Sequence, residues 1–406
     1  MGTMTAIRKP LLERFSAKNI PSALFRLLLQ VVRAREFALV LMLILIGCGL
    51  HLYTGEFFTS FGKEMERAAK NGRLTSELDS RLTYAIDEGR FFTEANLRAV
   101  GLGFAVSAIM VFGMTSALVS GGFDLSVGSV YALGGVVVAM ALQDGHAVGT
   151  AILYGVGVGL LAGGVNGLLI TWAKINPFIA TLGMLGIARG LSLVLTKGTP
   201  VTIAFKNFPS FVDPLGQGVT KGFPNLIIIG IGTIIIGDIL MRHSALFRQI
   251  YYVGGNEEAA RLSGINVRRV KIGVYMLSGM LAALAGVLSV SRFTVADPGA
   301  ATGEELRVIA ACIIGGCSLR GGKGTVLGGL LGLIFVALIN NAMILTRVPV
   351  YYQQLTMGIV LLLAVGLDTL GQHWAEIKTT VRHWWFRLKN LVGRLASGDS
   401  FASSKP

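Results

Sequence analysis

The sequence predicts an all-α integral membrane protein with about ten transmembrane helices. Of its 406 residues, 53% are hydrophobic and only 14% are charged, whereas soluble domains carry about 25% charged residues. Long apolar stretches recur along the chain, and a helix needs roughly 20 mostly apolar residues to cross a bilayer. The 54 glycines fit this class, because membrane helices use small residues to approach one another closely.

Ten apolar segments are the expected spans. They are 37–53, 97–119, 127–142, 148–172, 177–196, 224–241, 272–293, 305–318, 325–346 and 352–371. The third and the eighth are short for a full crossing, so we expect them to be tilted, re-entrant or extended into their glycine-rich flanks. The spans form one transmembrane domain, 37–371. It follows an amphipathic N-terminal segment, 1–36, and precedes a basic tail, 372–406.

The distribution of Lys and Arg predicts the orientation. The net charge is +14, but the basic residues lie outside the apolar segments. This favours the positive-inside rule over nucleic-acid binding. Six spans precede the basic loop 242–271 and four follow it, so that loop and both termini fall on one side, the cytoplasm. The mixed-charge insertion 54–96 is then periplasmic.

The loop 242–271 contains a polar stretch, GGNEEAARLSGINVRRVK, that predicts a short helix over 256–263. Asn256 is a good N-cap, and the two glutamates after it meet the positive end of the helix dipole. Glu257 and Arg261 are spaced to pair, and Gly264 supplies the left-handed residue that ends a helix. A helix of two turns is unstable alone. It therefore packs either on its own bundle or against a cytoplasmic partner.

EAARLSG resembles the EAA loop of ABC-transporter permeases, the short helix that sits in a cleft of the ATPase subunit. With its flanks it is similar to the form found in bacterial permeases of the ribose and galactose type. GGFDLSVGS, NPFIATLGMLGIARGL, IAACIIGGCSLRGGKGTVLGG and VGLDTL also resemble segments of that family, over about residues 91–371. One departure is Arg307, which stands where many members have Asp.

The resemblance implies a type II-like ABC importer permease bundle in the bacterial inner membrane, carrying a monosaccharide or a similar small polyol. The implied partners are a cytoplasmic ATPase subunit, a periplasmic sugar-binding protein and a second permease copy, a homodimer rather than a heterodimer. ATP and Mg would bind the ATPase, and this chain would hold no cofactor and catalyse no reaction. The residues expected to couple to the ATPase are Asn256, Glu257, Glu258, Ala259, Ala260, Arg261 and Gly264.

Polar residues near or within the spans are candidates for a gate or pathway, because polar groups in a membrane usually face the bundle interior or a cavity. The candidates are Gly121, Gly122, Asp124, Ser126, Ser129, Asn166, Asn340 and Asn341. For Asp124, Ser126 and Ser129, capping of the next helix is the structural alternative. For the asparagines, the alternative is hydrogen bonding between helices. The five histidines lie at no metal-ligand spacing, so we expect no metal site.

Two other functions remain open from the residues. A branched-chain amino acid-type ABC permease belongs to a similar family, although GGFDLSVGS favours sugars. A secondary transporter or channel working alone would need ion-coupling carboxylates within the spans. This sequence offers few of these, and a lone transporter would leave the cytoplasmic helix unexplained.

Overall fold

The computed structural model describes residues 35–54, 91–349, 351–353, 355–356, 358–363 and 365–366. The chain divides into two compact units, Met1–Gln353 and Gln354–Pro406. The described residues of the second unit are helical. Residues 1–34, most of the insertion 54–96 and the tail 372–406 lie outside the described residues, as does part of the expected last span.

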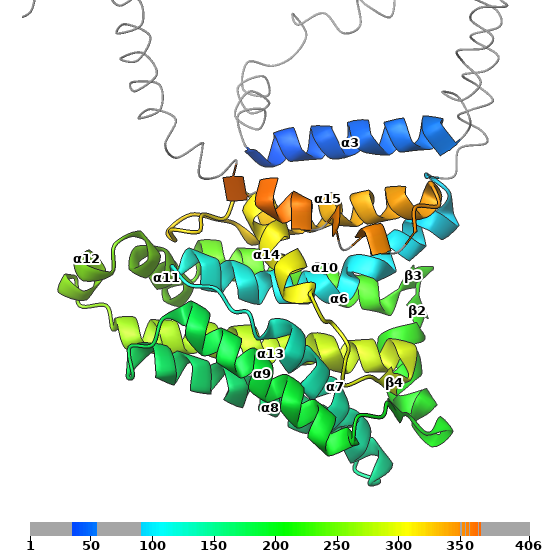
Figure 1. The fold of residues 1–406 in the computed structure, drawn as a ribbon, viewed down its shortest axis with the longest axis horizontal. Helices are drawn as coiled ribbons and strands as arrows, with labels where there is room; N and C mark the ends of the chain where they lie inside the picture. Colours follow the sequence, from blue (N-terminus) through cyan, green and yellow to red (C-terminus); the bar gives the residue numbers. More distant parts are fainter. Residues whose placement is uncertain are drawn as a thin grey trace, which may run out of the picture. The chain divides into compact units, whose positions relative to one another are not determined.

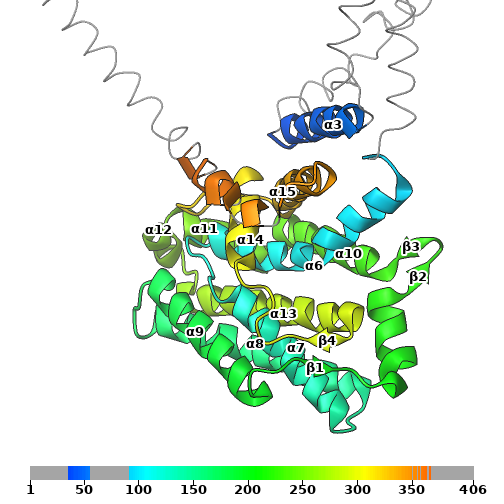
Figure 2. The ribbon, with the colours of Figure 1, turned by 45° about the vertical axis from the view of Figure 1, so that its right-hand side comes forward.

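The first unit is built almost entirely of helices, most of which run roughly along one direction (Figures 1 and 2). They are α3 (Arg35–Thr54), α6 (Glu94–Val119), α7 (Val127–Gln143), α8 (Val148–Thr171), α9 (Pro177–Thr196), α10 (Asn225–His243), α11 (Ala245–Gly255), α12 (Glu257–Leu262), α13 (Val267–Phe293), α14 (Glu304–Ile314) and α15 (Val326–Leu345). Six of the described helices are long and apolar enough to span a membrane. The predicted class, an all-α membrane protein, is confirmed.

Several boundaries differ from the prediction, and α13 begins at Val267 rather than at 272. α6 begins at Glu94, because Thr93 caps it by accepting a hydrogen bond from the amide of Asn96. α14 has 11 residues, which at 1.5 Å per residue is about half of the hydrocarbon core. It ends at Ile314, well before the expected 318, since the glycine-rich segment after it adopts positive φ at several positions. It therefore does not cross on its own. The loop 242–271 holds α11 as well as the predicted short helix.

Glycines bring α8 and α13 into backbone contact. A Cβ at Gly159 would overlap the carbonyl oxygen of Gly279, and one at Gly163 would overlap that of Tyr275. Gly155 and Gly167 continue the same row at intervals of four residues and also face α13 or α7. This is the small-residue packing expected of helices in lipid.

If each predicted span crosses the membrane once, successive spans end on alternate sides, and the contacts between helix ends fit this expectation. Short strands follow α9 and α13, the fifth and seventh spans: β1 (Val201–Thr202) pairs antiparallel with β4 (Val295–Ala296). At the other end, Gly322, between α14 and α15, donates its amide to the carbonyl of Val119, the last residue of α6 (2.8 Å). The last residues of the fifth and seventh spans therefore lie at one end of the bundle, and the last residues of the second and eighth spans lie at the other. Which end faces the cytoplasm stays a prediction.

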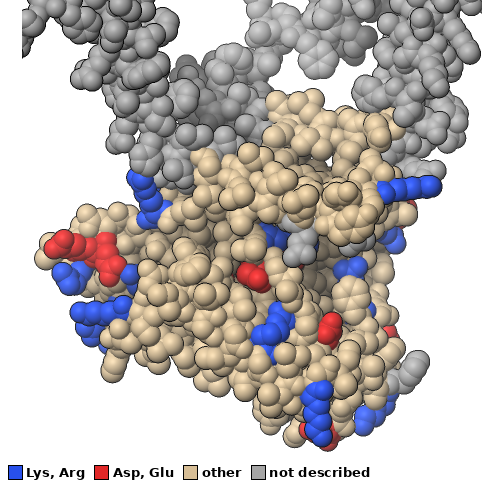
Figure 3. All heavy atoms as spheres, in the orientation of Figure 1, with Lys and Arg blue, Asp and Glu red and all other residues tan. Residues whose placement is uncertain are grey.

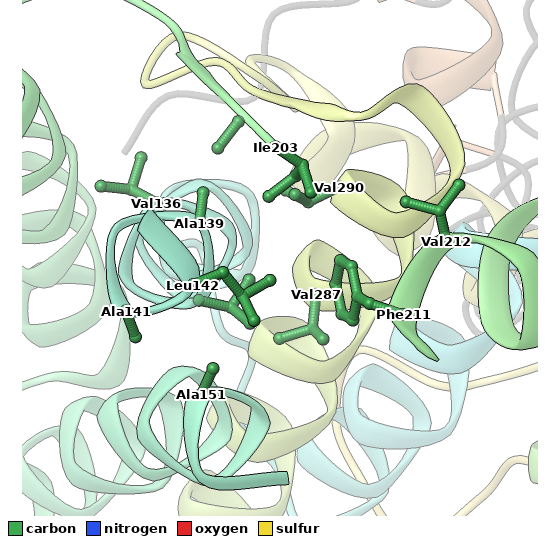
Figure 4. Close-up of a cluster of buried hydrophobic side chains, with 12 residues drawn as sticks. Val136, Ala139, Ala141, Leu142, Ala151, Ile203, Phe211, Val212, Val287 and Val290 are labelled. Atoms are coloured by element: carbon green, nitrogen blue, oxygen red, sulfur yellow. The ribbon is translucent and has the colours of Figure 1, made fainter. Parts of the chain in front are cut away.

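A core of small aliphatic side chains closes the β1–β4 end (Figure 4). Val136 and Leu142 of α7 pack there with Val287 and Val290 of α13 and with Phe211 of η3 (Phe208–Gln217), a wide helical turn. β2 (Val219–Thr220) and β3 (Phe223–Pro224) then pair and lead into α10. The long segment between α9 and α10 is thus anchored by burial at the end of the bundle opposite α12.

Candidate functional site

α12 is the predicted short helix, and its ends form as its sequence predicts. The Asn256 side chain accepts the amide of Ala259 at 2.9 Å. At the other end, Gly264 has φ +83, its amide bonds to the carbonyl of Arg261, and the amide of Ile265 bonds to that of Ala260. This pair of bonds is a Schellman motif, which satisfies carbonyls that the helix end leaves free. One prediction is wrong: among the described ion pairs, Glu257 pairs with Lys271 (2.6 Å), not with Arg261.

α12 rests on its own chain through one face and presents the other outward. Ala260 is buried and packs with Val253 and Val267. Glu257, Glu258, Ala259 and Arg261 are exposed, and Leu262 is 81% exposed. Charged residues of both signs gather at the α12 end of the face shown in Figure 3, whereas most of that face is uncharged. α12 is thus held in place by its buried face, and its outward face presents charged side chains and the apolar side chain of Leu262.

Backbone contacts join the segment before α12 to two other parts of the bundle. A Cβ at Gly254 would overlap the carbonyl oxygen of Val119 and would lie 2.8 Å from the amide nitrogen of Gly322. A Cβ at Gly321 would lie 2.7 Å from the oxygen of Gly254 and 2.8 Å from the Cα of Gly121. We call this meeting of Val119, Gly121, Gly254, Gly321 and Gly322 the glycine junction. It places the predicted gate residue Gly121 beside the segment that precedes α12.

Asp124, three residues after Gly121, lies at the centre of a buried polar cluster. Its carboxylate accepts the amide (2.9 Å) and the hydroxyl (2.5 Å) of Ser126, and also the hydroxyl of Ser278 (2.9 Å). Asn166 donates to the Ser126 hydroxyl at 3.1 Å. The carboxylate, rather than the N-cap residue Ser126, therefore orders the turn before α7. Ser278 of α13 was not predicted, because a single serine in an apolar span carries no pattern.

Of the other predicted gate or pathway residues, three make packing or hydrogen-bond contacts within the bundle and one lines a cavity. Ser129 donates to the carbonyl of Ser126 (2.9 Å) inside α7. Gly122 packs against the Tyr275 hydroxyl, where a Cβ would overlap it. Asn341 exchanges two hydrogen bonds with Asn96, at 2.7 and 3.1 Å, so it links α15 to α6. Asn340 lines a cavity between α6, α14 and α15.

Two of the charged residues within the expected spans are Asp238 and Arg189, and each bonds to a different partner. Asp238 bonds to Arg242 at 2.5 Å and accepts the amide of Leu327 at 3.2 Å, so it caps α15 from α10. Arg189 donates to the carbonyls of Pro298 and Ala300, at 2.7 and 2.8 Å. It therefore fixes the irregular segment that leads into α14.

The chain matches known transport permeases over most of its length. Residues 98–365 match the family described as the permease component of the branched-chain amino acid transport system. The ribose import permease protein of Escherichia coli is 41% identical over 283 residues, which is 70% of this chain and 88% of that protein. The ribose import permease protein of Bacillus subtilis is 41% identical over 264 residues, 65% of this chain and 81% of that one.

Arabinose permeases match as well. The L-arabinose ABC transporter permease protein of Azospirillum brasilense is 37% identical over 282 residues, 68% of this chain and 81% of that protein. No solved structure matches the chain significantly. The matched region includes α12, the glycine junction and the Asp124 cluster. The chain therefore belongs to this family of membrane-spanning transport permeases, which includes the ribose and L-arabinose permeases.

Proposed function

We propose that this chain is the membrane-spanning subunit of an ATP-driven importer that brings a monosaccharide or a similar small polyol into a bacterial cell. The named sugars of relatives that are 37–41% identical support this substrate class over branched-chain amino acids. The helical bundle supports transport. The described residues hold no group of three or more His, Cys, Asp or Glu that could bind a metal.

α12 carries the proposal for the ATPase partner. Its short helix is held rigid by Asn256 at one end, by the Schellman motif at the other and by Ala260 beneath. Such a helix can bear on a partner without bending. Leu262 is the proposed anchor, because a largely exposed apolar side chain gains most from burial in an interface. The charges around it would select and steer the partner.

The glycine junction supplies a route from α12 into the bundle. Backbone atoms of α11, of the turn after α6 and of the loop before α15 touch without side chains between them. A displacement of α12 by the ATPase would therefore move those segments directly, as a rigid lever between two global states. The nearby turn that Asp124 orders is the proposed gate.

The remaining partners follow from the same proposal. A periplasmic binding protein would deliver the sugar at the β1–β4 end, and a second permease copy, preferably identical, would complete the assembly. The basic regions support a cytoplasmic position for both termini and for α12. ATP and Mg would bind the ATPase and not this chain.

The test is co-purification of the ATPase from membranes of the native host. Leu262→Asp, and separately Glu258→Lys with Gly264→Pro, should lose an ATPase that the wild type retains, by roughly 30-fold for an anchor worth about 2 kcal/mol. Lys221→Ala is the control, exposed in the turn between β2 and β3 and away from α12. If no ATPase accompanies the wild type under gentle conditions, or if the variants keep it, the proposal fails.

A further inference from the structure

The residues between β4 and α14 run from one end of the bundle to its middle without forming a helix. We call these residues, 297–303, the unwound segment. It starts at the β1–β4 end of the bundle, and Arg189, in the second half of α9, donates to two of its carbonyls, at 2.7 and 2.8 Å. It ends at Glu304, which accepts the hydroxyl of Ser107 at the middle of α6. The unwound segment and α14 therefore make one crossing of the bundle, whose first half is irregular backbone.

Much of the unwound segment lies on the surface of the chain. Asp297, Gly299 and Thr302 are exposed, and Leu306, in the first turn of α14, is 47% exposed. In Figure 1 the segment runs across the front of the bundle between α14 and β4. Figure 3, in the same orientation, shows charged atoms of both signs in the middle of this face, most of which is uncharged. The segment is thus part of an open face and not of the core.

Lipid is an unfavourable neighbour for such a face. Irregular backbone at membrane depth is found only where it is buried in protein or lines a water-filled cavity, because hydrocarbon offers its amides and carbonyls no hydrogen bonds. Charged side chains within spans follow the same rule, and Arg189 and Glu305 are both partly exposed where they bond to the unwound segment. α10 differs, since its exposed side chains are mostly isoleucines, of which Ile236 is 59% exposed. The surface of α10 suits lipid, whereas the face with the unwound segment needs water or protein.

The unwound segment also touches the start of α7. A Cβ at Gly128, in the first turn of α7, would overlap the carbonyl oxygen of Ala301 and the carboxylate of Glu305. Gly128 follows the turn that Asp124 orders, and Asp124 accepts the hydroxyl of Ser278, in the middle of α13. α7 and α14 thus both begin within the depth of the bundle, where interrupted helices form the substrate sites of many transporters. Movement of the proposed gate would reach the unwound segment through this contact.

We infer that the unwound segment faces water inside the membrane and forms one wall of the sugar pathway, and that the same segment of a second permease copy forms the opposite wall. The inference rests on the proposed import of a small polyol and adds the location of the pathway and the face through which two copies meet. A two-fold contact presents the same surface of each copy to the other. The second copy shields the irregular backbone from lipid, and the space between the two segments stays hydrated for an uncharged polyol.

The first measurement is the reactivity of an introduced thiol. Thr302→Cys and Ile236→Cys are each made in a Cys48→Ser background, since the other two cysteines are buried. The importer, assembled in proteoliposomes and hydrolysing ATP, is treated on both sides with a charged methanethiosulfonate reagent. We expect Thr302→Cys to react at least about tenfold faster than Ile236→Cys, because the reactive thiolate is stable in water and not in hydrocarbon. Ile236→Cys is the matched control, exposed near the middle of α10. Leu306→Cys provides a second test position and should react like Thr302→Cys.

Cross-linking and uptake are the second measurement. A bifunctional methanethiosulfonate reagent should join two Thr302→Cys chains into a covalent dimer, because the two segments face each other across the pathway. Lys221→Cys, exposed in the turn between β2 and β3, should react in water and give no dimer. Thr302→Cys should import D-ribose or L-arabinose, whichever the wild type imports, before labelling. Complete labelling with the charged monofunctional reagent should abolish that uptake while the ATPase stays bound.

The outcomes separate this inference from the proposed function. If the wild type imports a sugar while Thr302→Cys and Leu306→Cys react no faster than Ile236→Cys, the unwound segment does not face water. The inference then fails and the importer proposal stands. Labelling without a covalent dimer would overturn the two-copy arrangement, and undiminished uptake after complete labelling would overturn the pathway. If the wild-type assembly imports no sugar at all, the proposed function fails, and this inference fails with it.

Discussion

Replacing Gly254 by alanine tests the glycine junction at the point where it has no room. The added Cβ would lie 2.8 Å from both the Gly322 nitrogen and the Val119 carbonyl carbon, and it would overlap the Val119 oxygen. All three are backbone atoms, which cannot rotate away as a side chain would. Contacts below 3.0 Å are essentially never seen for real Cβ atoms. Overpacking of this kind costs about 1–3 kcal/mol, and the Gly322–Val119 hydrogen bond, worth about 1 kcal/mol, is also strained.

We expect Gly254→Ala to separate the two segments and uncouple the importer. Uptake into proteoliposomes should fall roughly tenfold or more per ATP hydrolysed, since about 1.4 kcal/mol of lost coupling is a factor of ten. The melting temperature of the purified assembly should fall as well. Gly255→Ala is the matched control, because its Cβ would meet nothing within 4 Å. The junction is refuted if Gly254→Ala keeps its uptake within about twofold of the wild type and its melting temperature within about 1 °C. These limits are about the error of such assays.

Four further substitutions test the packing and polar contacts. Gly159→Ala should destabilise the chain by about 1–3 kcal/mol through overlap with Gly279, whereas Gly157→Ala on the same helix, with open space around it, should be neutral or stabilising in thermal unfolding. Asp124→Leu should leave the Ser126 and Ser278 donors unpaired and cost about 1–3 kcal/mol for each. Ser278→Ala should cost about 1 kcal/mol, and equal melting temperatures for the two variants would contradict the cluster. Lys271→Ala, which removes an ion pair to a 58% exposed glutamate, should change stability by less than about 1 kcal/mol.

The helices could be predicted largely from the sequence because lipid imposes a long apolar run on every span. α9 begins and ends at the predicted residues, since Asn176 and Pro177 mark its start and Lys197 its left-handed end. α12 was equally predictable, because its caps are local. α14 was overestimated, because composition alone cannot show that a run of small apolar residues stops being helical where glycines adopt positive φ.

The contacts between distant segments could not be predicted in the same way. Asp124 and Ser126 are near neighbours, so their hydrogen bonds follow from spacing, but Ser278 joins them from 154 residues away. Asn96 and Asn341 are separated by 245 residues. Leu262 has no sequence signal, because an apolar residue after four polar or small ones is as consistent with burial as with exposure. Only the packing of Ala260 beneath α12 decides which side faces outward.

The glycine junction joins the end of α6 to the loop between α14 and α15. α6 ends at Val119, and the loop with Gly321 and Gly322 joins α14 to α15. Under the proposed function, transported sugar and an ATPase on α12 would act on the same helices, and their binding free energies should be linked reciprocally. We expect the imported sugar to change the affinity of the chain for its ATPase, and the ATPase to change the affinity for the sugar by the same factor. Gly254→Ala should bring that factor close to one in titrations of both ligands. A factor that persists in this variant would mean that the coupling follows another route.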